Sequence, residues 1–179
     1  DVPYKLAASF STSLQTIPAA GASLRGDNLG SYTMSFTGSG AMFKGTDVDF
    51  FISHVGVDPG ITNTAFEFND TVGGIRRFIA DTVRVDECAV FGKFTDMLIA
   101  QIENSNGQCA NAGVQFFGTS NTIWSIDRLA LISTSASFKG VDFGTATAVV
   151  LEIDNLFFNA PAGAFGISGL ANSGNVPVG

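Results

Sequence analysis

Short segments in which apolar and polar residues alternate recur along the whole chain, and this alternation constrains the fold more than any other feature. Ser31 to Thr37 shows it clearly, because Tyr, Met and Phe alternate there with Ser and Thr. A period of two places successive side chains on opposite faces of a β-strand. Gly, Asn, Asp and Pro separate such segments, as in Asp58-Pro59-Gly60, and these residues favour turns. The chain is therefore predicted to be all-β.

The spacing of the segments predicts about ten short strands. Gly38-Ser39-Gly40 and Asn106-Gly107 are interpreted as turns between consecutive antiparallel strands. The expected fold is an antiparallel β-sandwich, in particular a jelly roll, with a closed barrel as the alternative. At most one short helix is expected, over Asp96 to Ile102, where a helical turn competes with a strand. No internal repeat of fixed period is detected.

The length of 179 residues suits one domain. Residues 1–158 are predicted to form a single β-sandwich domain, within which residues 1–12 form a strand that copies of the chain can exchange. Residues 159–179 are rich in Gly, Ala and Asn and carry almost no charge, so they are predicted to form a tail or linker.

The charge balance and the hydropathy exclude two kinds of partner. A formal net charge of -7 repels phosphate backbones, so no nucleic-acid partner is predicted. The strongest apolar run, Ala146 to Leu151, is too short for a membrane helix. No membrane span is therefore expected in this chain.

The two cysteines, Cys88 and Cys109, point to an oxidising compartment. An even number of cysteines without metal-ligand spacing indicates one disulfide, and two buried thiols are the alternative. The chain begins at Asp1 instead of Met, which fits a mature end left by signal-peptide cleavage, although a trimmed chain would look the same. Both observations predict a secreted protein, extracellular or at the cell surface.

The sequence offers little for catalysis. His54 is the single histidine, and one histidine cannot build a multi-histidine zinc site. No Gly-x-Ser-x-Gly elbow accompanies it for a Ser-His-Asp site. His54 is expected to share a strand face with Phe50 and Ile52, as a packed or edge histidine. No enzyme activity and no catalytic residue are predicted.

Acidic residues are the remaining candidates for a ligand site. Asp47 and Asp49 lie two residues apart, which places both on one strand face, where they repel unless a cation lies between them. Calcium is the one cofactor considered for them, and solvated surface carboxylates are the preferred interpretation. Asp81, Asp86 and Glu87 form the second acidic group.

The segment Leu151 to Phe158, which contains Ile153-Asp154-Asn155, and the tail that follows it resemble the close of bacterial PEP-CTERM proteins. The likeness covers roughly the last 30 residues, and the Pro-Glu-Pro signature, membrane helix and basic end of that family are missing from this sequence. The resemblance implies export from a Gram-negative cell and a place on the surface or in the biofilm matrix. It implies no enzyme activity.

Three classes of function remain in competition. The leading hypothesis is a structural protein that self-associates through β-edges into filaments or layers, with an assembly strand formed by Tyr4, Leu6, Ala8 and Phe10. Pairing of this strand within its own domain is the alternative. The second class is a carbohydrate-binding module for matrix polysaccharide with Trp124, Tyr4 or Tyr32 as platforms. A glycan-cleaving enzyme would need a carboxylate pair across a groove.

Overall fold

A computed structural model describes residues 3–6, 10–26, 33–74, 76–119, 122–144, 146 and 149–168. All regular elements in these ranges are strands, so the all-β prediction is confirmed. In chain order the strands are β1 (Pro3–Leu6), β2 (Phe10–Thr12), β3 (Gln15–Thr16), β4 (Ala22–Gly26), β5 (Thr33–Phe36), β6 (Ala41–Thr46), β7 (Phe50–Asp58), β8 (Gly60–Asn69), β9 (Arg77–Thr95), β10 (Ile99–Phe117), β11 (Thr122–Ile132), β12 (Lys139–Asp142), β13 (Val149–Asn159) and β14 (Phe165–Ser168).

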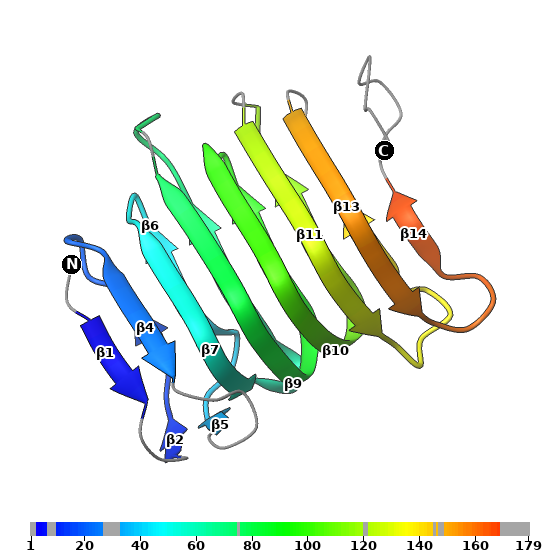
Figure 1. Cartoon of the computed structure of the whole chain (residues 1–179), viewed down its shortest axis with the longest axis horizontal. Coiled ribbons are helices and arrows are strands. Elements are labelled where there is room, and N and C mark those ends of the chain that lie inside the picture. The colour runs from blue at the N-terminus through cyan, green and yellow to red at the C-terminus, as the bar shows by residue number, and fades with distance from the viewer. Residues whose placement is uncertain are drawn as a thin grey trace.

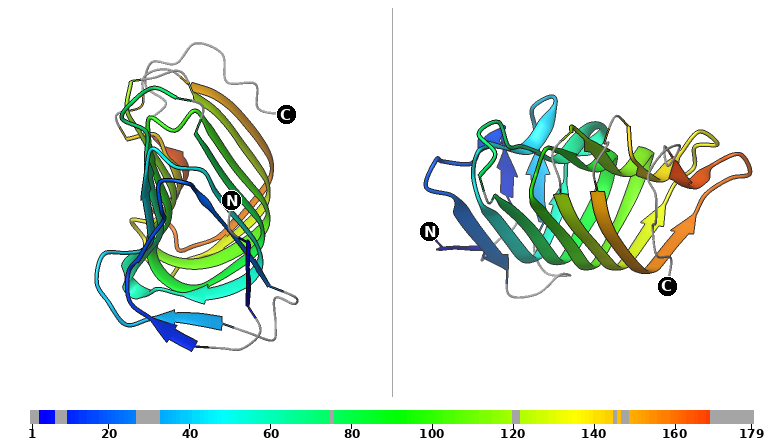
Figure 2. Two further views of the ribbon diagram at one scale, coloured as in Figure 1. Left: turned by 90° about the vertical axis from the view of Figure 1, so that its left-hand side faces the viewer. Right: turned by 90° about the horizontal axis from the view of Figure 1, so that it is seen from above.

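The strands form a β-solenoid, and the prediction of an antiparallel β-sandwich or jelly roll is wrong. Every pairing among the described strands is parallel, from β1 with β4 at one end to β12 with β14 at the other. The chain winds in successive coils that stack along one axis (Figures 1 and 2). Alternation of apolar and polar residues indicates that a strand has one buried and one solvent-exposed face. It does not indicate whether the neighbouring strand is parallel or antiparallel.

Two ladders of stacked strands make up the walls of the solenoid. The first ladder has the order β1-β4-β7-β9-β10-β11-β13, and most of its strands lie side by side in Figure 1. The second ladder follows the pairings of β3, β6, β8, β9, β10, β12 and β14. The long strands β9 and β10 belong to both ladders, so they join the two walls at a corner.

The coils form an internal repeat of unequal period, which explains why no fixed period is visible in the sequence. Phe50 pairs with Phe78 in the next coil, whereas Arg77 pairs with Ile99 after a shorter turn. Loops absorb these differences, while the register within each ladder is kept. Such loop insertions hide the repeat from a search at constant spacing.

The same reason decides one open alternative and makes one local prediction wrong. The segment Asp96 to Ile102 contains no helix, because Asp96 turns the chain with a φ of 53° and β10 starts at Ile99. Asn106-Gly107 is not a hairpin turn but lies inside β10, where Gly107 pairs with Val85 and with Leu131. In a stacked coil these backbone groups find partners in both neighbouring coils, and that context overrides local preference.

Aromatic side chains fill the space between the two walls. Phe78 of the first ladder lies 4.7 Å from Phe94 of the second, measured between ring centroids. Further along the axis, Phe94 contacts Phe116, and Phe116 stacks on Trp124 with a centroid distance of 3.5 Å and an interplanar angle of 10°. This aromatic ladder runs through the coils and contains many of the 17 Phe side chains of the sequence.

A column of left-handed residues bends the first ladder. Ile52 and Val55 are both buried although they lie three positions apart, because His54 between them has a φ of 56° and resets the alternation. The register places a residue of positive φ at the same point of the coils that follow. The members of this column are His54, Thr82, Asn104, Arg128 and Asn155.

Candidate assembly interface

The two ends of the solenoid expose unpaired strand edges. Among the described strands, β1 pairs only with β4, β13 only with β11, and β14 only with β12. One side of each terminal strand therefore offers N–H and C=O groups that lack a ladder partner in this part of the chain. Such edges are templates for pairing with another chain.

An outward column of the first ladder is electrically polarised along the solenoid axis. The pairings place Arg25 beside Ser53, and then a carboxylate at this position in each later coil. Arg25 at one end and Asp154 at the other are exposed. We call this set the charged column; from the amino-terminal coil onward it comprises Lys5, Arg25, Ser53, Asp81, Glu103, Asp127 and Asp154.

Like charges on adjacent strands repel, and the column of left-handed residues reduces this repulsion. Asn104 Nδ2 donates to Asp81 Oδ1 at 3.0 Å, and Thr82 Oγ1 donates to the same oxygen at 2.8 Å. The Arg128 guanidinium lies 2.8 Å from Asp127. The hydrogen bond from Asn104 contributes most to lowering the pKa of Asp81; burial opposes it, and Thr82, His54 and Arg128 add to the lowering.

The matching outward column of the second ladder is neutralised within the chain. Lys44 lies 3.3 Å from Glu67 of the next coil. Asp142 accepts hydrogen bonds from Ser168 at 2.7 Å and from Lys139 at 3.0 Å. Burial disfavours the charge of Asp142, but these hydrogen bonds outweigh it and lower the pKa. Of these two columns, the charged column of the first ladder changes from cationic to anionic along the axis.

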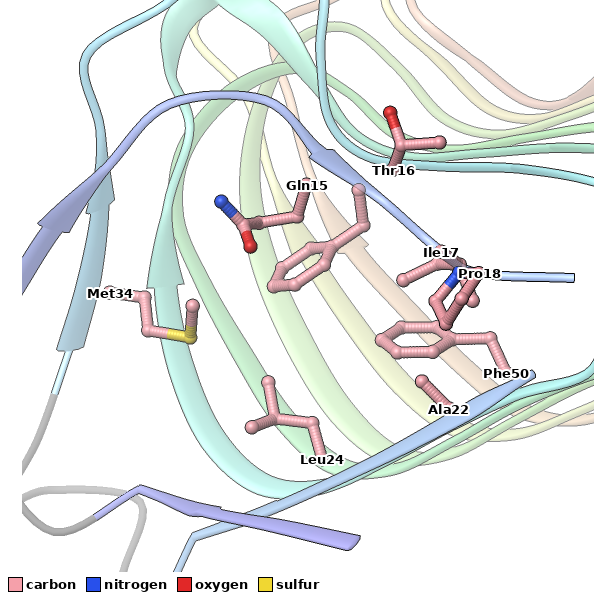
Figure 3. Close-up of a pocket in the computed structure, with 9 residues that line it drawn as sticks. Gln15, Thr16, Ile17, Pro18, Ala22, Leu24, Met34 and Phe50 are labelled. Carbon is pink, nitrogen blue, oxygen red and sulfur yellow. The ribbon is translucent and has the colours of Figure 1, made fainter. Parts of the chain in front are cut away.

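Both ends also present apolar surface. Near the amino-terminal end, a cavity of about 220 Å³ is lined largely by apolar side chains, among them Leu24, Met34 and Phe50, which point into the ring of strands (Figure 3). At the other end, Phe158 pairs in register with Leu131 of the preceding coil. Leu131 is buried, whereas Phe158 is 46% exposed. Ile153 and Leu156 are only partly buried there.

The residues of the predicted assembly strand do not form one strand. Tyr4 and Leu6 lie in β1, in register with Leu24 and Gly26, whereas Phe10 lies in β2 and pairs with Met34. Ala8 is outside the described residues. Within the single chain these segments form the first coil of the solenoid, and strand exchange stays a prediction.

The two cysteines are neighbours in adjacent coils. Cys88 of β9 pairs with Cys109 of β10, both are buried, and their Sγ atoms lie 2.9 Å apart as free thiols. Adjacent strands lie about 4.8 Å apart, which falls within the Cα separations of disulfides. The hydrogen bond to Cys109 and burial raise the pKa of the Cys88 thiol. The disulfide itself stays a prediction.

The predicted calcium ligands connect coils. Asp47 accepts hydrogen bonds from the backbone N–H and the hydroxyl of Thr71, and these two bonds, the hydroxyl first, lower its pKa. Asp49 accepts from the backbone N–H of Arg77 and forms an ion pair of 3.0 Å with its guanidinium. In the described ranges, no three His, Cys, Asp or Glu side chains gather as a metal site would require.

His54 and Trp124 occupy structural positions. His54 belongs to the left-handed column, so it does not simply continue the face of Phe50 and Ile52 as predicted. Trp124 is 1% exposed, stacks on Phe116 and donates from Nε1 to the carbonyl of Met97 at 3.2 Å. Trp124 therefore offers no platform to a sugar in this structure, and Tyr32 lies outside the described residues.

A sequence signal for the charged column exists but is easily missed. Ile126-Asp127-Arg128-Leu129 and Ile153-Asp154-Asn155-Leu156 share the order apolar, acidic, left-handed, apolar, and occupy equivalent positions. Ile102-Glu103-Asn104-Ser105 varies this order only at its end. The Ile-Asp-Asn motif thus marks the bend of a coil.

No protein-family model, curated protein or solved structure matches this chain. None of the described residues belongs to a helix long and apolar enough to cross a membrane.

Proposed function

We propose that this protein is a secreted, non-catalytic structural subunit that associates with its own copies through the terminal strands of the solenoid. The products are filaments or layers of the extracellular matrix or cell surface. One observation carries the proposal: strand edges without a ladder partner among the described residues lie at opposite ends of one rod-like stack of coils (Figure 1). Contacts between two different surfaces of a protein generate open filaments unless the geometry closes into a ring.

The chemistry of the ends supports this proposal over a monomeric role. Terminal repeats of solenoids need a polar outer face to remain soluble. Here the last coil exposes Phe157 and Phe158 by 66% and 46%. Apolar groups at an unpaired edge are characteristic of surfaces that become buried on association.

Sedimentation velocity over a range of protein concentrations, combined with electron microscopy, tests the proposal. We expect elongated particles that lengthen with concentration at neutral pH. A compact monomer at all accessible concentrations would rule out the structural role.

A further inference from the structure

We infer that the copies join head to tail: β13 of one copy docks on β1 of the next, so that Asp154 lies opposite Lys5. This inference rests on the proposed function and specifies the direction and register of the contact. It predicts that the first ladder continues from one copy into the next without a change of strand direction.

The strand directions favour this arrangement. The described strands pair only in parallel, and β1 and β13 are the two terminal strands of one ladder. Translation along the axis places β1 of a second copy beside β13 in the same direction. Contact between two β13 strands would instead require an antiparallel pair, and its two-fold symmetry would end the assembly at a dimer.

The charged column favours head-to-tail contact over contact between two like ends. In head-to-tail contact, the carboxylates of Asp127 and Asp154 are followed by the register positions of Lys5 and Arg25 from the next copy. Adjacent strands lie about 4.8 Å apart, close enough for cross-strand charge pairs. Contact between two carboxyl-terminal ends would instead bring the carboxylates of both copies together, which is unfavourable.

The interior columns match in the same register. Ile153 is the last member of the column that starts with Tyr4 and Leu24, so the next copy would continue that column with another Tyr4. Phe158 ends the column of Phe10 and Met34. Head-to-tail contact would therefore cover the half-exposed Phe158 ring with the first coil of the neighbour, as the interior coils cover one another.

Charge reversal tests the inference. Asp154→Lys and Lys5→Glu each place like charges at the contact, and each should raise the critical concentration for assembly about tenfold or more. The double variant, Asp154→Lys with Lys5→Glu, restores opposite charges and should return the critical concentration to within about threefold of the parent. Higher salt should weaken the effect of each single variant, because exposed charges are screened.

Glu87→Lys is the matched control, because Glu87 is exposed in a middle coil and the change alters net charge by the same amount as Asp154→Lys. Thermal unfolding of every variant establishes that the fold is retained. If the parent assembles but both single variants behave like Glu87→Lys, or the double variant is not restored, the head-to-tail register is wrong while the structural role stands. If the parent never assembles, the proposed function itself fails.

Discussion

Single carboxylates connect the coils at several points, and their ionisation links stability to pH. Asp47, Asp81 and Asp142 accept hydrogen bonds from the next coil, and the pKa of each is lowered in the folded chain. A group whose pKa is lower in the folded state stabilises that state above its unfolded value of about 3.9. This contribution disappears as the pH falls through the folded pKa.

We therefore expect stability to be nearly constant above about pH 5 and to fall steeply below about pH 4. Asp81→Asn and Asp142→Asn should lower stability at pH 7 and reduce the loss between pH 5 and pH 3. Urea unfolding at a series of pH values measures this slope. Glu87→Gln, which changes an exposed carboxylate of a middle coil, is the control. An unchanged slope in both test variants would contradict the role given to these carboxylates.

The paired cysteines are the second residue-scale feature with a measurable consequence. Cys88 and Cys109 are 21 residues apart in the sequence and adjacent in the ladder. In an oxidising compartment we expect them to form a disulfide that contributes about 3 kcal/mol. Cys109→Ala should lower the free energy of unfolding by about that amount in oxidised protein and by less in reduced protein.

Mass spectrometry after alkylation of denatured, unreduced protein measures the thiols directly. The expected result is no alkylation until a reductant is added. Two alkylated cysteines in protein isolated from its native compartment would contradict the disulfide and weaken the argument for export.

At the scale of the strands, we expect the aromatic ladder to contribute strongly to stability. Phe116 is 1% exposed and contacts aromatic rings of three other strands or loops: Phe94, Trp124 and Phe143. Phe116→Ala would leave a cavity between the two walls, because neighbouring coils fix the backbone around it. The expected loss is about 3 to 5 kcal/mol.

Chemical denaturation of Phe116→Ala and of the control variant Ile61→Ala measures the free energy of unfolding that each change costs. Ile61 is 55% exposed, so its replacement should cost less than about 1 kcal/mol. A similar small loss for both variants would show that the aromatic ladder does not hold the walls together.

The strands show which part of the structure is readable from the sequence. Alternation correctly predicts strands such as β5, because a half-buried strand needs one apolar face. Alternation assigns the side chains after His54 to the wrong faces of the strand. The reason is that His54 is left-handed, with a φ of 56° that is visible only in the folded structure, and a left-handed residue shifts the alternation. The Asn-Gly dipeptide also wrongly predicts a turn at Asn106-Gly107, where the neighbouring coils instead keep the strand continuous.

The direction of the strands could not be predicted, because parallel and antiparallel strands with one wet face share the same pattern. The charged column could not be predicted either, because its acidic residues are separate from one another in the sequence. Asp81 and Asp154 are far apart in sequence, and they join one column only once the coil lengths are known. Of the predicted site residues, Cys88 and Cys109 are brought together, whereas Tyr4 and Phe10 are divided between two strands.

At the scale of the whole molecule, the solenoid is a short segment of a structure that addition of coils can extend. Its ladders run along one axis (Figure 2). Its interior columns and its charged column follow the registers of these ladders. Copies that continue these features would form a filament whose strands lie perpendicular to the filament axis. This geometry differs from a filament built by a linker or by side-to-side packing of complete subunits.

X-ray diffraction from aligned assemblies of the purified protein tests this central claim most directly. Continuation of the ladders predicts a strong reflection at about 4.8 Å along the filament axis, since the strands stack in that direction. It also predicts an axial subunit repeat of about 34 Å, the height of the seven strands of the first ladder at that spacing. Filaments with the 4.8 Å spacing perpendicular to their axis, or a protein that stays monomeric, would contradict assembly through the ends of the solenoid.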